Sequence, residues 1–227
     1  MFYYDSTFVI LIPAILLSLY AQAKIQSTYS KYSKQYSLSG LTGAEAARRI
    51  LDYNGLYDVA IEMIPGNLTD HYDPRDRVLR LSQGVFHSSS IAAIGVAAHE
   101  AGHALQHNRG YVPLIFRNAL VPVANIGSNL SWVLILLGIF LSSAGLINLG
   151  ILLFTAVVLF QVITLPVEFN ASSRALNQLD NYNILYKEEL YKAKKVLGAA
   201  ALTYVAATLM AISQLLRLIV LTRDSRD

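Results

Sequence analysis

Four long apolar runs divide the chain. They cover residues 7–23, 119–142, 146–167 and 196–221, and each is close to the roughly 20 residues that a membrane-spanning helix needs. The second and third runs are separated only by Ser143-Ala144-Gly145, which is typical of a tight turn. The pattern therefore predicts four transmembrane helices, the middle two forming a hairpin.

The first run follows an acidic and aromatic N-terminus rather than a basic one. A cleaved secretory signal has a basic segment ahead of its apolar core, whereas here Lys24 comes after the run. We therefore interpret residues 7–23 as a retained transmembrane helix anchored at the membrane surface by Phe2, Tyr3 and Tyr4. A cleaved signal is the alternative.

Three polar residues interrupt the first arm of the hairpin. Asn125, Ser128 and Asn129 lie in its first half, where an amide or hydroxyl facing lipid would be costly. We expect these side chains to face protein rather than lipid.

The residues between the first two runs have the alternating pattern of a small α+β region. Thr42 and Glu45 have the spacing of a capping box and predict the start of a helix. Residues 59–64 and 77–81 are short and apolar enough for strands, with a turn expected at residues 68–74. If the second strand is an edge strand, an extended peptide could pair with it near Val78. An ordinary hairpin without a substrate role is the alternative.

Composition agrees with a membrane protein. The 227 residues are 54% hydrophobic and only 15% charged, with a mean hydropathy of +0.43, against roughly a quarter charged in soluble domains. There is no cysteine, so disulfides and cysteine-ligated metals are excluded. The net charge of +3 is scattered, which gives no reason to expect a nucleic-acid partner.

The distribution of basic residues predicts the orientation. Of the 18 Lys and Arg residues, all except Arg217, Arg223 and Arg226 lie either between the first two runs or between the last two. These two loops must share one side of a four-span protein, and basic loops favour the cytoplasm. We expect a multi-pass protein of the inner (cell) membrane with both loops on the cytoplasmic side.

The candidate chemistry lies in the first of these loops. His99 and His103 are one helical turn apart in an H-E-x-x-H pattern, so both imidazoles can reach one metal ion. Glu100 lies beside them and can deprotonate a water that the metal activates. The preceding Ser88-Ser89-Ser90 is a plausible N-cap for this helix, and the small apolar residues that follow predict a buried helix.

A catalytic zinc takes three protein ligands and leaves one position open. Glu168 begins the second basic loop, on the same predicted side of the membrane, and is our candidate third ligand; an interfacial carboxylate paired with Arg174 is the alternative. His107 would be about 12 Å from His99 along a straight helix and would need a bend to share the ion, so we expect it to orient or pack against other groups. His71 is interpreted as a polar surface residue or as one that orients groups at the site, and a donor to a developing oxyanion is the alternative.

Three motifs together resemble a known family. AAHEAGHALQH, the upstream HYDPRDRVLRLS and PVEFNASSRALNQL, on a small four-span chain, resemble the YugP-type membrane zinc metallopeptidases of bacteria over nearly the whole sequence. More distantly the chain is similar to the gluzincin membrane proteases of the HtpX and CAAX-prenyl-protease type, which place their third ligand after a membrane hairpin.

The resemblance implies roles for individual residues. His99, His103 and Glu168 would bind one Zn²⁺ ion, and Glu100 would be the general base. Ser172 stands where the distant relatives have an aspartate, so the usual carboxylate partner of a zinc-bound imidazole is missing there. The orientation of the histidines must then come from elsewhere, with Asn170 as one candidate.

The sequence therefore predicts a mostly α-helical membrane protein with four transmembrane helices and a small α+β, zincin-like cytoplasmic region containing a short edge strand and the H-E-x-x-H helix. Its parts would be residues 1–24 (transmembrane helix), 25–118 (zincin-like region), 119–167 (transmembrane hairpin), 168–195 (helix with the third ligand) and 196–227 (transmembrane helix and tail). The predicted function is a zinc endopeptidase that is embedded in the lipid bilayer and hydrolyses peptide bonds of membrane or membrane-proximal polypeptides. The alternative is a non-catalytic membrane scaffold or adaptor with a structural zinc site.

Overall fold

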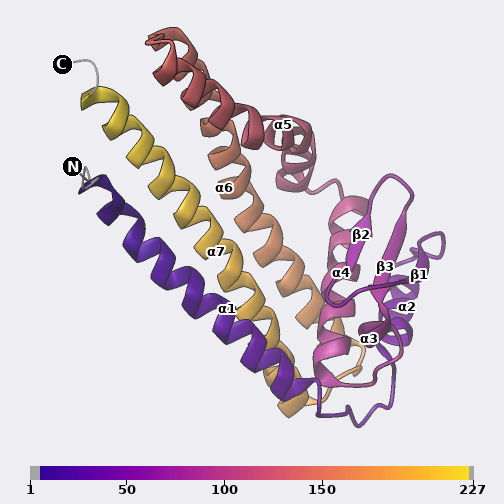
Figure 1. Ribbon diagram of the computed structural model, residues 1–227. Helices are drawn as coiled ribbons and strands as arrows, with labels where there is room; N and C mark the ends of the chain where they lie inside the picture. The colour runs from indigo at the N-terminus through magenta and orange to yellow at the C-terminus, as the bar shows by residue number, and fades with distance from the viewer. Residues whose placement is uncertain (1–5, 225–227) are drawn as a thin grey trace. The chain divides into compact units, whose positions relative to one another are not determined.

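The computed structural model describes residues 6–224, most of them helical (Figure 1). The elements in chain order are η1 (Ser6–Leu11), α1 (Ile12–Tyr32), α2 (Gly43–Tyr53), β1 (Ala60–Ile64), β2 (His71–Asp73), β3 (Val78–Ser82), α3 (Gln83–Phe86), α4 (Ile91–Asn108), α5 (Val112–Phe140), α6 (Ala144–Asn181) and α7 (Lys187–Asp224). The anchors expected at Phe2, Tyr3 and Tyr4 lie outside the described residues.

Within residues 6–224, four helical segments are long and apolar enough to cross a membrane, as predicted. They cover Ser6–Tyr32, Val112–Phe140, Ala144–Asn181 and Lys187–Thr222. Each helical segment begins before or ends beyond its apolar run, as where α1 continues through residues 24–32. In particular, α6 continues without a break beyond the third run as far as Asn181, and the lysine-rich residues that follow belong to α7.

The hairpin turn lies slightly earlier than expected. The expected turn at Ser143-Ala144-Gly145 is wrong by about two residues, because α5 ends at Phe140 and α6 already begins at Ala144. Ser142 adopts a left-handed conformation with φ of 49°, and the Ser143 N–H donates to the Gly138 carbonyl at 2.8 Å. These two features terminate α5 and reverse the chain.

The chain forms two compact units. The first comprises Met1–Gln22, Ile115–Pro166 and Thr203–Asp227, and the second comprises Ala23–Leu114 and Val167–Leu202. The division falls inside α1, α5, α6 and α7, so each of these helices contributes residues to both units.

The first unit contains the most apolar parts of the four long helices. Ile135, Phe154, Val158 and Leu218 form its buried cluster. Small residues allow α5 and α6 to approach closely, as at Gly150, where a Cβ atom would lie 2.8 Å from the Ser131 carbonyl oxygen. Close backbone approach at small residues is the usual way in which membrane helices gain packing energy.

Two of the three polar residues that were expected to face protein are exposed in the described part of the chain. Asn125 and Asn129 are exposed, and only Ser128 is half-buried. The expectation that all three face the protein interior is therefore wrong for a single copy of the chain. The reason is the helix period, which directs the small residues Ala124 and Gly127 inward and turns Asn125 and Asn129 outward.

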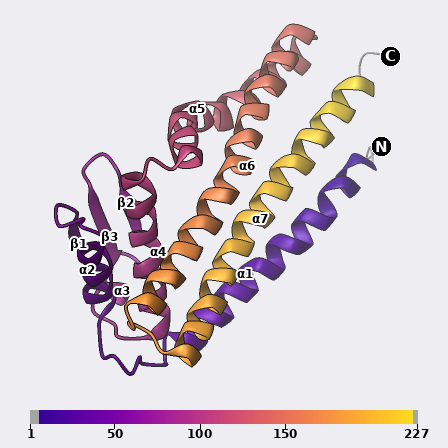
Figure 2. The same cartoon turned by 180° about the vertical axis from the view of Figure 1, so that it is seen from behind.

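The second unit is built around the predicted α4 and a small sheet (Figure 2). The expected caps are present: Thr42 and Glu45 form a capping box on α2, and the Ser90 hydroxyl accepts from the Ala93 N–H at the start of α4. The core gathers apolar side chains from α2, α4 and the sheet, including the fully buried Ile50, Leu79 and Ile94.

The sheet has the strand order β1-β3-β2, with β1 parallel to β3 and β2 antiparallel to it. Both predicted strands form, but residues 77–81 are not an edge strand: β3 is central and paired on both sides. The outer strands are β1 and β2, and β2 lies inside residues 68–74, where the sequence predicted only a turn. A three-residue strand is too short to show an alternating pattern.

Helices α4 and α6 meet almost backbone to backbone. A Cβ atom on Gly102 would lie 2.6 Å from the carbonyl oxygen of Ala171, which is closer than atoms in proteins approach. Only glycine allows this contact, so it sets the distance between α4 and the part of α6 that follows Val167.

The substitutions Gly102→Ala and Gly198→Ala should have opposite effects on stability. The first forces α4 and α6 apart and should cost about 1–3 kcal/mol, as overpacking does. The second, in α7, places a methyl group in open space and should gain up to about 1 kcal/mol from helix propensity. Denaturant unfolding of the detergent-solubilised protein measures both; equal effects of the two alanines would contradict the close contact.

Candidate functional site

Three side chains that the sequence singled out converge in the second unit. His99 and His103 lie on one face of α4, and Glu168 lies on α6. Glu168 Oε2 is 3.2 Å from His99 Nε2 and 3.7 Å from His103 Nε2. The carboxylate is buried and the two imidazoles are half-buried. Among the described residues this is the group of His, Asp and Glu side chains that could hold a metal ion.

The spacing of these atoms fits a tetrahedral ion. One ligand atom from each residue lies within 4.8 Å of the others. Ligands about 2.0–2.1 Å from a tetrahedral zinc ion are about 3.3 Å apart, and the two separations between Glu168 Oε2 and the Nε2 atoms are close to this value. A buried carboxylate next to two imidazoles is also a donor set that zinc favours.

Gln106 determines the tautomer of His103. This fully buried side chain directs Nε2 to the carbonyl oxygen of Val167 at 2.8 Å. Because a carbonyl only accepts, the amide nitrogen must face Val167, and Oε1 must then face His103 Nδ1 at 3.0 Å. His103 Nδ1 therefore carries the proton and donates to Gln106, which leaves the Nε2 lone pair free for a metal.

Ser172 plays the corresponding role for His99. Its Oγ lies 3.1 Å from His99 Nδ1 and accepts from it when Nε2 is the free, metal-facing nitrogen. The expectation that the orientation of the histidines must come from elsewhere than position 172 is therefore wrong for His99, because the Ser172 hydroxyl can accept the hydrogen bond that a carboxylate would accept. The difference is that both histidine partners, Ser172 and Gln106, are neutral.

The hydrogen bonds continue away from His103 along α6. Asn170 Oδ1 accepts from Gln106 Nε2 at 3.0 Å and from Arg174 Nε at 2.7 Å. Arg174 also lies over the Tyr111 ring, with its guanidinium carbon 5.9 Å from the ring centre. The alternative pairing of Glu168 with Arg174 is not formed; instead Arg174 holds the amide that orients Gln106.

Glu100 lies beside the histidines and contacts the outer strand of the sheet. Its Oε2 accepts from the backbone N–H of Tyr72 in β2 at 3.1 Å. Burial raises the pKa of the Glu100 carboxyl, while the nearby His99 and His103 act to lower it. The main-chain hydrogen bond fixes the carboxylate within a site that is largely shielded from solvent.

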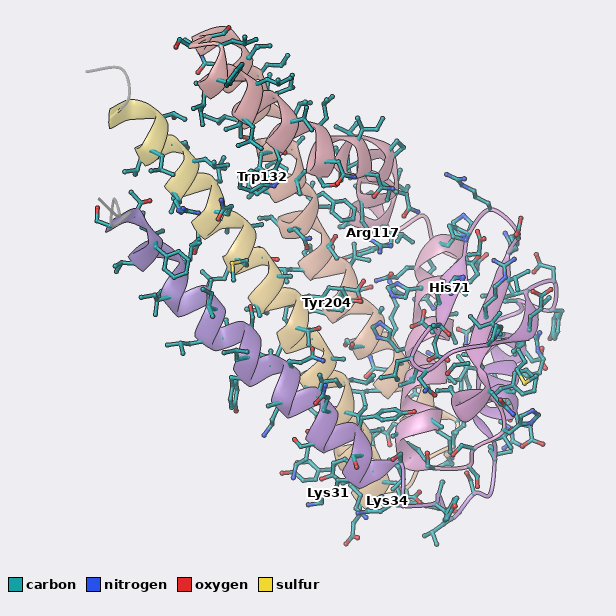
Figure 3. All side chains as sticks on the ribbon, viewed as in Figure 1. Lys31, Lys34, His71, Arg117, Trp132 and Tyr204 are labelled. Atoms are coloured by element: carbon teal, nitrogen blue, oxygen red, sulfur yellow. The ribbon has the colours of Figure 1, made fainter. Side chains whose placement is uncertain are left out.

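The remaining histidines lie outside the candidate metal group. His107 Nδ1 is 2.9 Å from the hydroxyl of Tyr72, which agrees with the expected orienting role. His71, labelled in Figure 3, belongs to β2 and donates through Nδ1 to the Thr69 carbonyl at 2.9 Å. Its side chain is exposed.

Sequence reasoning missed Gln106 and Tyr72. Gln106 follows His103 by three residues, a spacing at which two helical side chains meet, so that spacing was the available signal. Tyr72 contributes a backbone donor, and nothing in a side-chain pattern identifies such a group.

Comparison with known proteins agrees with this geometry. Residues 7–223 match the profile of the family described as "putative neutral zinc metallopeptidase". The chain is 53% identical over 216 residues to the "putative membrane protease YugP" of Bacillus subtilis (strain 168), covering 95% of this chain and 96% of that protein. No solved structure matches the chain.

The similarity extends over nearly the whole length of both proteins, and with the four apolar helices it indicates a multi-pass membrane protein. The chain belongs to the neutral zinc metallopeptidase family that this profile describes.

Proposed function

We propose that the protein is an integral membrane zinc endopeptidase of the gluzincin type. In this proposal His99, His103 and Glu168 bind one zinc ion, and Glu100 is the general base. The observation that supports it most is the approach of Glu168 Oε2 to both Nε2 atoms, while each Nδ1 atom has its own acceptor. A zinc ion bound there supplies Lewis-acid chemistry, which acidifies a water molecule and polarises a peptide carbonyl.

Glu100 would move the protons of the reaction. Its carboxylate takes a proton from the attacking water as that water adds to the carbonyl carbon. It then gives the proton to the nitrogen of the leaving amine, so the peptide bond breaks with no net change in the enzyme. The Tyr72 N–H holds the Glu100 carboxylate in place during both steps.

The polypeptide substrate would lie along β2 rather than β3. Both edges of β3 are already paired, so a peptide cannot add to β3 near Val78 and would have to pair with an outer strand instead. The Tyr72 N–H points away from β3 and toward Glu100, so the unpaired edge of β2 borders the proposed base. An extended peptide added there would bring its main chain next to Glu100.

The proposed location of the site is the cytoplasmic side of the inner membrane. Both loops that contribute to the site contain most of the basic residues, which favours the cytoplasm. In the naturally cysteine-free chain, an impermeant maleimide should label Ser142→Cys in the hairpin turn of intact cells. It should label Lys34→Cys only after permeabilisation; the reverse pattern would contradict this orientation.

The substitution Glu100→Gln should abolish cleavage and leave zinc bound. The amide keeps the size of the side chain but cannot accept the proton, so hydrolysis of fluorescein-labelled casein should fall by about 100-fold or more. The zinc content of this variant, measured by elemental analysis, should equal that of the wild type. Slower hydrogen exchange of the β2 amides when casein is added would show that a substrate strand binds there. Undiminished cleavage by Glu100→Gln would exclude Glu100 as the general base. A wild-type protein that binds zinc but does not cleave casein would favour the alternative function, a non-catalytic membrane scaffold.

Zinc binding should fall in graded steps across three substitutions. Glu168→Ala removes a ligand and should leave little zinc after dialysis. Ser172→Ala removes the acceptor of His99 and should weaken zinc binding about 10–100-fold. Ser173→Ala, the exposed neighbour, is the matched control and should bind normally. Competition with a chelating dye measures the series; unchanged metal content in Glu168→Ala would rule out this ligand set.

A further inference from the structure

The outward face of α5 contains a polar residue in an apolar seam. The spacing is 3, 4, 3 and 4 residues along Ile126, Asn129, Val133, Leu136 and Phe140, which is the pattern of a two-helix seam. All five side chains are exposed, and the four apolar ones are between 50% and 85% accessible. Figure 3 shows side chains of α5 extending away from α6 and α7, its neighbours in this part of the chain.

Asn129 lies deep in the predicted membrane. It precedes the end of α5 at Phe140 by a distance of about 16 Å along the helix. Because the apolar core of a bilayer is about 30 Å thick, Asn129 falls near its middle. Asn125 lies one turn earlier, beside the seam, and is also exposed. Neither amide hydrogen-bonds through its side chain to another described residue.

An exposed amide at this depth requires a hydrogen-bonding partner. Lipid tails supply no donor or acceptor, and an unsatisfied polar group in hydrocarbon is costly. Asparagine side chains in membrane helices are usually satisfied by a second helix. The face of α5 that contains Asn129 is therefore an interface rather than a lipid-facing surface.

We propose that this face of α5 binds the same face of a second copy of the chain. An amide both donates and accepts, so Asn129 can pair with its own equivalent across a two-fold axis. Two copies insert in the membrane with the same orientation, which places equal depths of α5 opposite each other. A helix of another protein would need its own polar residue at the same depth.

This dimer is a property of the transmembrane unit and does not depend on the proposed peptidase chemistry. The seam, Asn125 and Asn129 all belong to residues 115–166 of the first unit, whereas the candidate metal ligands belong to the second. Dimerisation and zinc binding can therefore be measured separately.

The absence of cysteine makes a direct test possible. Single-cysteine forms of the full chain, Ile126→Cys and Val133→Cys, are placed in phosphatidylcholine vesicles at high lipid-to-protein ratio and oxidised with copper phenanthroline. Both should form disulfide-linked dimers, because equivalent positions meet at a two-fold seam. Leu152→Cys on α6 is the matched control: it is 65% exposed but off the seam and should stay monomeric.

A second substitution tests the amide. Adding Asn129→Leu to Val133→Cys should lower dimer formation about tenfold, because the interhelical hydrogen bonds are lost, while adding Ile126→Leu should not. Equal cross-linking of Leu152→Cys would show random collision and overturn the proposal. Cross-linking of Val133→Cys that is unchanged by Asn129→Leu would also overturn it. The same holds if, in native membranes, the chain forms disulfide adducts only with a different protein. Zinc content of each variant reports that the chain is folded.

Discussion

The approach of α4 to α6 at Gly102 and Ala171 is the contact on which the candidate site depends. Neither helix has a metal site alone: α4 provides two imidazoles and α6 provides the carboxylate. Backbone contact at Gly102 brings Glu168 within 3.7 Å of both Nε2 atoms, and Gln106 joins the two helices again through the Val167 carbonyl. Gly102, within the H-E-x-x-H segment, thus allows the close helix contact that brings the three candidate ligands together.

The electrostatics of the site follow from which partners are charged. One carboxylate faces the two Nε2 atoms, whereas the Nδ1 atoms donate to a hydroxyl and an amide. Neutral acceptors orient the imidazoles but, unlike an aspartate, add no negative charge to the ligands. The second carboxylate, Glu100, is held separately by a backbone N–H of β2. The site therefore keeps the proposed ligand and the proposed base distinct, although both are buried glutamates.

Features with a local cause could be predicted from the sequence. The caps at Thr42 and Ser90, the helical spacing of His99 and His103, and the four apolar segments each depend on residues close together in the chain. The meeting of Glu168 with α4 was inferred from topology and from resemblance, not from any local pattern. The rest depends on tertiary contacts: the order of three short strands, the hydrogen bonds of Gln106, and the partner of His99 all arise only when α6 packs on α4. The outward direction of Asn129 likewise depends on which face of α5 packs inward.

The central claim is that His99, His103 and Glu168 bind one zinc ion and leave a position open beside Glu100. Anomalous scattering at the zinc edge, from crystals of the full chain, tests it most directly. We expect one peak at bonding distance from both Nε2 atoms and a Glu168 oxygen, with Glu100 close to it but not coordinated. A peak coordinated by His107 in place of Glu168, or a zinc with four protein ligands and no open position, would contradict it.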